Sequence, residues 1–294
     1  MCAHQPPRRV PVSCCTSCRH LCPMYLVIVW RLLLPYPILC HMEKQSVRLE
    51  VDGLGIAGMA FLPAGPGPHP VLCVSHGLPA GPPDPNDQGY QSLAERCCGE
   101  GFATMIFNFR GAGQSEGNMD MLGWCRDLAA VVERSLSLPR VDPGRVNLLG
   151  FSAGAAVSVY VAAHDRRVTA VACSACPAKF RFPSTEKAQE FLAHLREIGL
   201  VRDPGFPASV EDWMAGFSGA SPLKWVEQVS PRPLLLLHGD RDEVVPLESA
   251  HSLMQKAGEP KELQVIAGAG HRLRRDPRAM DAALAWLKRT NHLA

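Results

Sequence analysis

The 294-residue sequence predicts an α/β protein in which a mostly parallel central sheet is flanked by helices. Short apolar runs typical of strands alternate with helical patterns along much of the chain. One such run, 145–149, leads through a glycine-rich turn into a small-residue helical stretch, 155–163. Polar segments follow two later runs, 233–237 and 263–266. Because parallel strands place their carboxyl ends at one edge of the sheet, these segments are expected to lie together.

The individual elements follow from local patterns. A strand with alternating faces is expected from Met42 and a second over 54–62, before a Gly/Pro turn at 63–70. Apolar residues at i, i+4, i+7 and i+8 predict an amphipathic helix over 124–136. Further strands are expected at 71–74, 102–107, 145–149, 168–173, 233–237 and 263–266, and further helices at 90–99, 155–163, 186–198 and around 284–287.

Residues 178–229 interrupt this rhythm and are interpreted as an insertion into a core made of 42–177 and 230–294. The insertion contains one helix, 186–198, and then a stretch broken by Pro and Gly as far as Pro222. It is rich in aromatic residues, several of which must pack the insertion onto the sheet. Three are singled out as candidate substrate-binding residues: Phe206, Trp213 and Phe217.

The segment Gly150–Gly154 reads Gly-Phe-Ser-Ala-Gly, with Ser152 at its centre. Between a strand and a helix, this pattern predicts a sharp turn that exposes the serine hydroxyl, and the glycines remove Cβ atoms that would collide there. A serine hydroxyl is a weak nucleophile, so it needs a histidine base and a carboxylate that orients the histidine.

Candidates for both partners follow the two later strands. Asp240, Asp242 and Glu243 come after the run 233–237, and His271 comes after the run 263–266. Position alone leaves Asp240 and Asp242 as rival acids, with Glu243 weaker. Two further histidines in glycine turns, His76 and His238, are interpreted as structural residues bonded to nearby backbone.

Five segments in this order resemble the α/β-hydrolase superfamily of serine hydrolases, in particular carboxylesterases similar to dienelactone hydrolases and cinnamoyl esterases. The segments are Ser-His-Gly-Leu (75–78), Asn-Phe-Arg-Gly-Ala-Gly-Gln-Ser-Glu-Gly (108–117), Val-Asp-Pro-Gly-Arg-Val leading into Gly-Phe-Ser-Ala-Gly (141–154), His-Gly-Asp-Arg-Asp-Glu-Val-Val-Pro (238–246) and Gly-Ala-Gly-His (268–271). The resemblance covers about residues 46–290. It implies the α/β-hydrolase fold, a cap formed by the insertion between strands 6 and 7, Ser152 as nucleophile, Asp242 as acid and His271 as base.

The resemblance also locates the donors that would stabilise an oxyanion. One is the backbone N–H of Ala153, immediately after the nucleophile. The other is assigned to the backbone N–H of Leu78, although the unusual Pro-rich segment after it, 79–85, would allow a shift by one residue.

Composition excludes several other classes of protein. Hydrophobic residues make up 47% and charged residues 20%, as in a soluble globular protein, and a net charge of +2 is too weak to indicate nucleic acid or an anionic membrane as partner, so neither is expected. The glycines after Arg110 lack the βαβ context of a dinucleotide site, so no cofactor is expected. Cys173 and Cys176 have Cys-x-x-Cys spacing without a second pair, so no metal is expected.

Residues 1–41 are rich in Cys, Pro and Arg without periodicity and are interpreted as a disordered extension. The apolar stretch 21–40 is long enough for a membrane anchor, but Arg31 near its centre and three prolines argue against one. Because most of the remaining cysteines fall in apolar strands and helices, a reducing, cytoplasmic location is expected.

The sequence therefore predicts a serine hydrolase of carboxylic esters with small to medium acyl or aryl groups. Three alternatives stay open: a peptidase of the prolyl-oligopeptidase type, a thioesterase or acyltransferase, and a non-catalytic binding protein of the same fold. The segment Val-Asp-Pro-Gly-Arg-Val (141–146), which precedes the proposed nucleophile, favours the peptidase. The insertion argues against it, because a segment of this size leaves little room for a domain that recognises the end of a peptide. The physiological substrate and the oligomeric state do not follow from the sequence.

Overall fold

The computed structural model describes residues 42–79, 89–180, 182 and 184–294. The predicted extension, 1–41, and the end of the segment after Leu78 lie outside the described residues. Within them, no helix is long and apolar enough to span a membrane.

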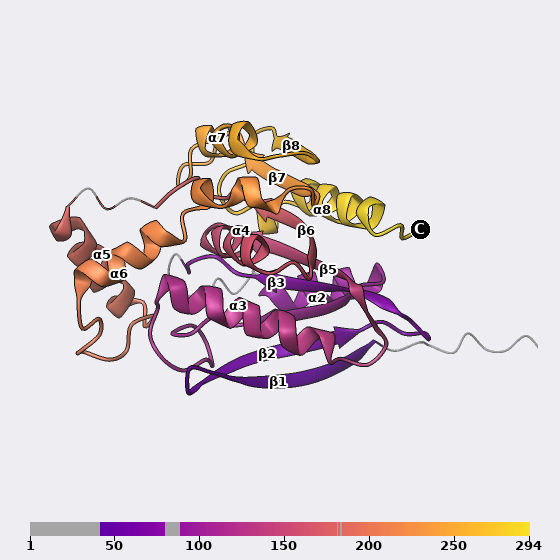
Figure 1. The fold of residues 1–294 in the computed structure, drawn as a ribbon, viewed down its shortest axis with the longest axis horizontal. Helices are drawn as coiled ribbons and strands as arrows, with labels where there is room; N and C mark the ends of the chain where they lie inside the picture. Colours follow the sequence, from indigo (N-terminus) through magenta and orange to yellow (C-terminus); the bar gives the residue numbers. More distant parts are fainter. Residues whose placement is uncertain (1–41, 80–88, 181, 183) are drawn as a thin grey trace, which may run out of the picture. The chain divides into compact units, whose positions relative to one another are not determined.

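Eight strands of the described chain form one sheet in the order β1-β2-β4-β3-β5-β6-β7-β8 (Figure 1). The first two strands join antiparallel, β2 also runs antiparallel to β4, and all later neighbours are parallel. The strands are β1 Glu43–Val51, β2 Leu54–Leu62, β3 His69–Ser75, β4 Ala103–Phe107, β5 Val141–Phe151, β6 Val168–Ser174, β7 Leu234–Gly239 and β8 Lys261–Ile266. The mostly parallel sheet expected from the sequence is confirmed.

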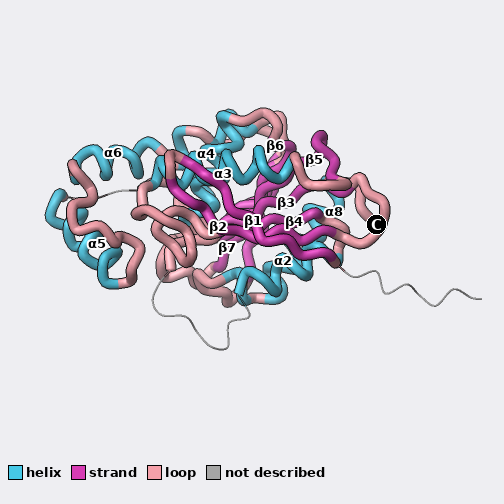
Figure 2. Tube along the Cα trace, turned by 90° about the horizontal axis from the view of Figure 1, so that it is seen from below, coloured by secondary structure: helices cyan, strands magenta, loops and turns pink. Residues whose placement is uncertain are grey.

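Helices cover both faces of this sheet, because its central strands are apolar on both sides. The helices α3 and α4 pack on one face, and α2 and α8 pack on the other (Figure 2). The helix α7 packs on the same face as α3 and α4. Their bounds are α2 Gly89–Gly99, α3 Met121–Leu136, α4 Ala153–His164, α5 Thr185–Glu197, α6 Val210–Gly219, α7 Glu248–Lys256 and α8 Pro277–Thr290, with 3₁₀ turns at Pro222–Lys224, Val226–Val229 and Leu273–Arg275.

Between β6 and β7 the chain forms α5 and α6, which lie at one end of the sheet (Figure 1). This end carries the carboxyl termini of the parallel strands, since α6 contacts α3, which begins just after β4 and its loop. Two of the hydrogen bonds that anchor the insertion there involve the backbone of Met119. Met119 N–H donates to the Leu200 carbonyl at 2.8 Å, and the Trp213 indole N–H donates to the Met119 carbonyl at 3.0 Å.

The helix α6 lies in the stretch after 198, for which the sequence predicts no helix because Pro and Gly interrupt it. Ser209 caps it, with its hydroxyl accepting from the backbone N–H of Asp212 at 3.1 Å. Gly216 and Gly219 lower the helical propensity of this segment, yet Trp213 and Phe217 bury an apolar face that outweighs it. Tertiary packing therefore decides the conformation here.

A buried ion pair fixes the loop that follows β4. The Arg110 guanidinium is 6% exposed and lies 2.7 Å from the carboxylate of Asp127 on α3, which is fully buried. It also lies 2.9 Å from the carboxylate of Asp52, which is partly exposed. Burial raises the pKa of Asp127, and the hydrogen bonds and charge of Arg110 oppose that shift. A buried pair of this kind is costly to break from one side, so it holds the loop against α3.

Candidate active site

Ser152 lies in a sharp turn between β5 and α4, with φ +52° and ψ −122°. A non-glycine residue in this region is strained, and the neighbouring structure must hold it there. A Cβ atom on Gly150 would approach the Cα of Ala155 to 2.5 Å, and one on Gly154 would approach the His76 carbonyl oxygen to 2.3 Å. The two glycines are therefore required by the close approach of backbone on both sides of Ser152.

The structure brings Ser152, His271 and Asp242 together from the ends of three strands. The Ser152 Oγ lies 3.0 Å from Nε2 of His271, whose Nδ1 lies 2.8 Å and 3.0 Å from the two carboxylate oxygens of Asp242. With Nδ1 donating to the carboxylate, Nε2 is the acceptor for the serine proton. The arrangement has the connectivity of a nucleophile, a base and an orienting acid.

The Asp242 carboxylate is held in place from a second side as well. Its side chain is fully buried, and Oδ1 also accepts the backbone N–H groups of Val244 at 2.9 Å and Val245 at 2.8 Å. These bonds stabilise the ionised carboxylate away from solvent, and they leave Oδ2 directed at His271.

The rival acids occupy other positions. Asp240 Oδ1 accepts the N–H of Gly268 at 2.6 Å and so ties the loop before His271 to the end of β7. The two loops are in close contact, because a Cβ atom on Gly239 would lie 2.2 Å from the Ala269 carbonyl oxygen. Glu243 is exposed and reaches the backbone of Gly270.

His76 and His238 bond to backbone, as the sequence reading expects of structural histidines. His76 Nε2 accepts the Phe109 N–H at 3.1 Å, so the proton is on Nδ1, which donates to the Gly77 carbonyl at 2.7 Å. Burial lowers the pKa of His76, and the Gly77 bond partly opposes it. His238 Nε2 lies 2.8 Å from the Val245 carbonyl and 3.4 Å from Oδ2 of Asp242, a proximity that the sequence did not reveal.

Two backbone N–H groups were predicted as oxyanion donors. Ala153 is the first residue of α4, so its N–H is among those without an intrahelical acceptor, and the helix dipole favours negative charge there. Leu78 follows Gly77, which packs against the turn: a Cβ atom on Gly77 would lie 2.9 Å from the Ser152 Cβ and 3.5 Å from its Oγ. The loop that carries Leu78 therefore passes beside the serine.

The three aromatic candidates of the insertion differ in exposure. Trp213 and Phe217 are 4% and 1% exposed, and their rings pack against each other with centroids 4.9 Å apart and against Phe182 and Phe191. Phe206 is half-buried. In this conformation Trp213 and Phe217 form the interior of the insertion, and a role of the three in binding substrate stays a prediction.

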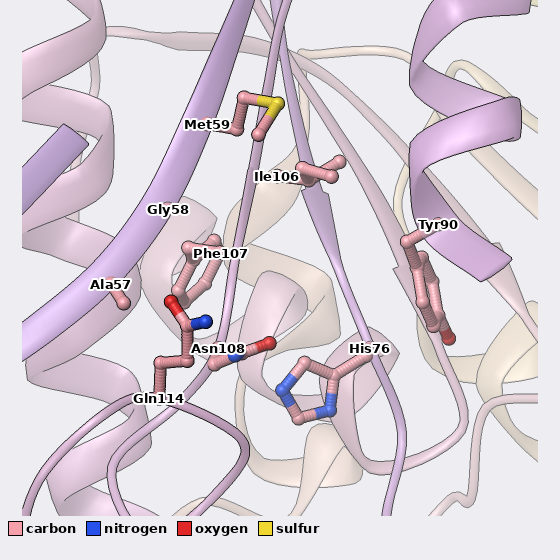
Figure 3. Close-up of a pocket in the computed structure, with 9 residues that line it drawn as sticks. All are labelled: Ala57, Gly58, Met59, His76, Tyr90, Ile106, Phe107, Asn108 and Gln114. Carbon is pink, nitrogen blue, oxygen red and sulfur yellow. The ribbon is translucent and has the colours of Figure 1, made fainter. Parts of the chain in front are cut away.

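A cavity of about 170 Å³ lies beside His76, between the middle of β2 and the carboxyl end of β4 (Figure 3). Local sequence patterns do not predict this cavity, because its walls come from segments that are far apart in the chain. Its lining residues are Ala57, Gly58, Met59, His76, Tyr90, Ile106, Phe107, Asn108 and Gln114.

The cysteines offer no metal site in the described part of the chain, where no cluster of three or more His, Cys, Asp or Glu side chains occurs. Cys73, Cys97, Cys98, Cys125, Cys173 and Cys176 are free and buried. Burial raises the pKa of the Cys73 thiol to about 12, so this thiol behaves as a small apolar group.

Several known proteins are similar to this chain in sequence or in fold. An uncharacterized protein of Mycobacterium tuberculosis is 27% identical over 236 residues, which span 78% of this chain and 72% of the relative. The α/β hydrolase GrgF of Penicillium superposes with a TM-score of 0.68 and 23% identity, over 84% of this chain and 99% of its own. The esterase Pf2001 of Pyrococcus furiosus superposes with a TM-score of 0.62 and 19% identity, over 84% of this chain and 93% of its own.

The sequence also matches the prolyl oligopeptidase family over residues 90–292, the part of the chain that contains Ser152, Asp242 and His271. Together with the parallel sheet and the turn at Ser152, this match assigns the fold and the superfamily. The chain is a serine hydrolase of the α/β-hydrolase superfamily and belongs to the prolyl oligopeptidase family.

Proposed function

We propose that this protein hydrolyses carboxylic esters of small to medium acyl or aryl groups through an acyl-enzyme. The observation that carries the proposal is the hydrogen-bonded chain of Ser152, His271 and Asp242. The Ser152 Oγ lies 3.0 Å from His271 Nε2, and His271 Nδ1 lies 2.8 Å from Asp242 Oδ2. Such a series activates a hydroxyl that is otherwise a weak nucleophile.

In the first half of the reaction, the Ser152 Oγ forms a bond to the ester carbonyl carbon while His271 Nε2 takes the serine proton. The tetrahedral intermediate carries its charge on the former carbonyl oxygen, for which Ala153 and Leu78 supply the N–H donors. As the carbon–oxygen bond to the alcohol breaks, His271 returns the proton to the departing oxygen. Asp242 keeps the imidazole in the required tautomer and stabilises its charged form.

In the second half, His271 takes a proton from water, whose oxygen attacks the acyl carbon. The bond to Ser152 Oγ then breaks, and the serine regains its proton from His271. The products are the carboxylic acid and the free enzyme, and no cofactor takes part in the proposed scheme.

A fluorophosphonate probe tests the nucleophile, because it reacts with an activated serine. We expect one labelled site, Ser152, found by mass spectrometry of the digested protein, and loss of nearly all ester turnover in Ser152→Ala. The matched control is Ser46→Ala, at an exposed position on β1. Labelling at another serine, with Ser152→Ala still active, would contradict the proposal, and absence of any labelling would favour a non-catalytic binding protein.

Membership of the prolyl oligopeptidase family supports a second candidate function, peptide hydrolysis. The two differ in the leaving group, since an amine requires proton delivery before it departs whereas a phenolate does not. Comparing kcat/KM on an acyl p-nitroanilide and the matching p-nitrophenyl ester separates them, and the thioester of the same acyl group tests the thioesterase. We expect the ester to be preferred by a wide margin. Equal values would favour the peptidase.

A further inference from the structure

We propose that the cavity beside His76 is a substrate subsite that binds a neutral hydrogen-bonding group, a hydroxyl or a carboxamide, on the part of the substrate remote from the reacting carbonyl. This inference rests on the proposed function, since the remainder of the substrate would lie at Ser152. It adds the chemical class of the group that the enzyme selects.

The position of the cavity places it within reach of the nucleophile. The cavity lies at the carboxyl end of β4, and β4 is separated from β5, the strand before Ser152, by β3 alone. Two interstrand steps amount to about 10 Å. His76 connects the two places, because its ring lines the cavity and the next residue, Gly77, packs against Ser152. A medium-sized ester can therefore span from Ser152 to the cavity.

The lining carries no fixed charge. Its imidazole, His76, is neutral, because Nε2 accepts the Phe109 N–H and burial lowers the pKa of the ring. The lining residues themselves offer no counter-charge to a carboxylate or an ammonium group, so they would not compensate such a group for the water it loses on entering.

Two side-chain amides are among the polar groups of the lining. Asn108 directly follows β4 and Gln114 lies further along the same loop, and Figure 3 shows both amides beside the space next to His76. Among the described residues, neither amide makes a hydrogen bond to the protein, so both retain donors and acceptors. The remaining walls are largely apolar, including Met59, Ile106 and Phe107. Apolar walls with a few polar groups are typical of small-molecule sites.

The loop that carries Gln114 is fixed before any ligand binds. The Ser115 hydroxyl accepts the Ala57 N–H at 2.9 Å and donates to the Asn108 carbonyl at 2.5 Å. The Arg202 guanidinium donates to the carbonyls of Gly113 at 3.0 Å and Ser115 at 2.9 Å, on either side of Gln114. A rigid backbone reduces the entropy lost when a ligand is ordered. A volume near 170 Å³ suits one small group, since an apolar cavity of about 150 Å³ holds benzene.

The test compares p-nitrophenyl esters whose acyl chains have equal length and different ends: heptanoate, 6-hydroxyhexanoate, the half-amide of adipic acid and the half-acid of adipic acid. A second series places the same four ends on the alcohol side of acetate esters. In at least one series we expect kcat/KM to be about fivefold higher for the hydroxyl or amide end than for the methyl end, the magnitude of one hydrogen bond. The carboxylate end should be the poorest.

The variants Gln114→Leu and Gln114→Glu identify the group responsible. Gln114→Leu should remove most of the preference for the hydroxyl and amide ends, and Gln114→Glu should lower kcat/KM for the carboxylate end further. The controls are Gln255→Leu and Gln255→Glu, the same changes at an exposed position on α7, which packs against β7 and β8. These control variants should leave the ratios of kcat/KM between the four chain ends unchanged.

The outcomes separate this subsite from the proposed function. Suppose that the wild-type protein is labelled at Ser152 and hydrolyses the heptanoate ester, but that its ratios of kcat/KM between chain ends equal those of Gln114→Leu in both series. The proposed ester hydrolase would then stand, and the proposed subsite would be wrong. If the wild-type protein neither reacts with the fluorophosphonate nor hydrolyses any ester, the proposed function fails first.

Discussion

His271 faces the fully buried carboxylate of Asp242, with Nδ1 2.8 Å from Oδ2 and 3.0 Å from Oδ1. Asp240, two residues earlier in the chain, instead bonds the backbone of the loop that precedes His271. The two acids are only two residues apart in the sequence, yet they have different partners. Asp242 bonds the imidazole of His271, and Asp240 bonds the loop that carries His271.

This difference predicts that two amide substitutions affect different properties, kcat in one case and stability in the other. Asp242→Asn should lower kcat by about 10⁴-fold, as expected when an amide holds the imidazole in the wrong tautomer. Asp240→Asn keeps an oxygen that can accept the Gly268 N–H, so it should act mainly on stability. Steady-state kinetics and urea unfolding measure the two effects. A larger loss of kcat in folded Asp240→Asn than in Asp242→Asn would exchange the roles.

His238 is predicted to be a positioning residue for Asp242. Its Nε2 lies 2.8 Å from the Val245 carbonyl and 3.4 Å from Oδ2 of Asp242, and Val245 N–H itself bonds Oδ1. His238→Phe keeps a ring in this buried place but removes the donor, so the segment 242–245 loses one of its anchors. We expect a lower kcat at nearly unchanged KM and a loss of about 1–3 kcal/mol in the free energy of unfolding.

The variant His238→Gln provides the comparison, because its amide retains an N–H. It should recover a substantial part of kcat relative to His238→Phe. If both variants lost stability equally and neither changed kcat, His238 would act on stability alone.

The close approach of Gly77 to Ser152 predicts a sharp effect of one added methyl group. A Cβ atom at this position would lie 2.9 Å from the Ser152 Cβ and 3.0 Å from the Phe151 carbonyl oxygen, so one of the two segments must shift. Because Leu78 follows directly, Gly77→Ala should displace the proposed oxyanion donor and lower kcat by about 10²-fold or more. Gly99→Ala on α2, where no atom lies within 4 Å of the added Cβ, is the control and should retain kcat. Equal kcat in the two variants would place the donor elsewhere.

Much of this arrangement follows from local sequence. The strands before Ser152, Asp242 and His271 are apolar runs, and the turn at Ser152 requires glycines at fixed positions, so the parallel sheet could be predicted from the chain itself. The helix α6 was missed because Gly216 and Gly219 mask a capping signal, Ser209 followed by Asp212. That pattern, Ser-x-x-Asp, is typical of a helix start and predicts one at this position.

The cavity beside His76 depends on relationships that local patterns do not encode. It requires the pairing of β2 with β4, in which Gly58 faces Phe107, and the docking of α2 that brings Tyr90 near His76. The contact of His238 with Asp242 likewise depends on how the loop after β7 turns back. Sequence spacing identified the residues of these segments, and the tertiary fold determines which side chains meet.

The aromatic residues of the insertion are predicted to divide into two groups by their burial. Trp213 and Phe217 are buried and contact each other and the rings of Phe182 and Phe191, so Trp213→Ala and Phe217→Ala should lower the free energy of unfolding by about 3–5 kcal/mol, measured in urea. Phe206 is half-buried and has surface free for a substrate. Phe206→Ala should therefore change relative kcat/KM between short and longer acyl esters.

The size of this change is bounded by the contact that is lost. One methylene in an apolar pocket contributes about 1–3 kcal/mol to discrimination, so shifts of about tenfold in the ratio of kcat/KM are expected, with little loss of stability. An unchanged ranking of esters in Phe206→Ala would place the acyl pocket outside the insertion. A changed ranking in Trp213→Ala, in a protein that keeps its stability, would instead mean that the insertion opens in solution and exposes its buried aromatic face to the substrate.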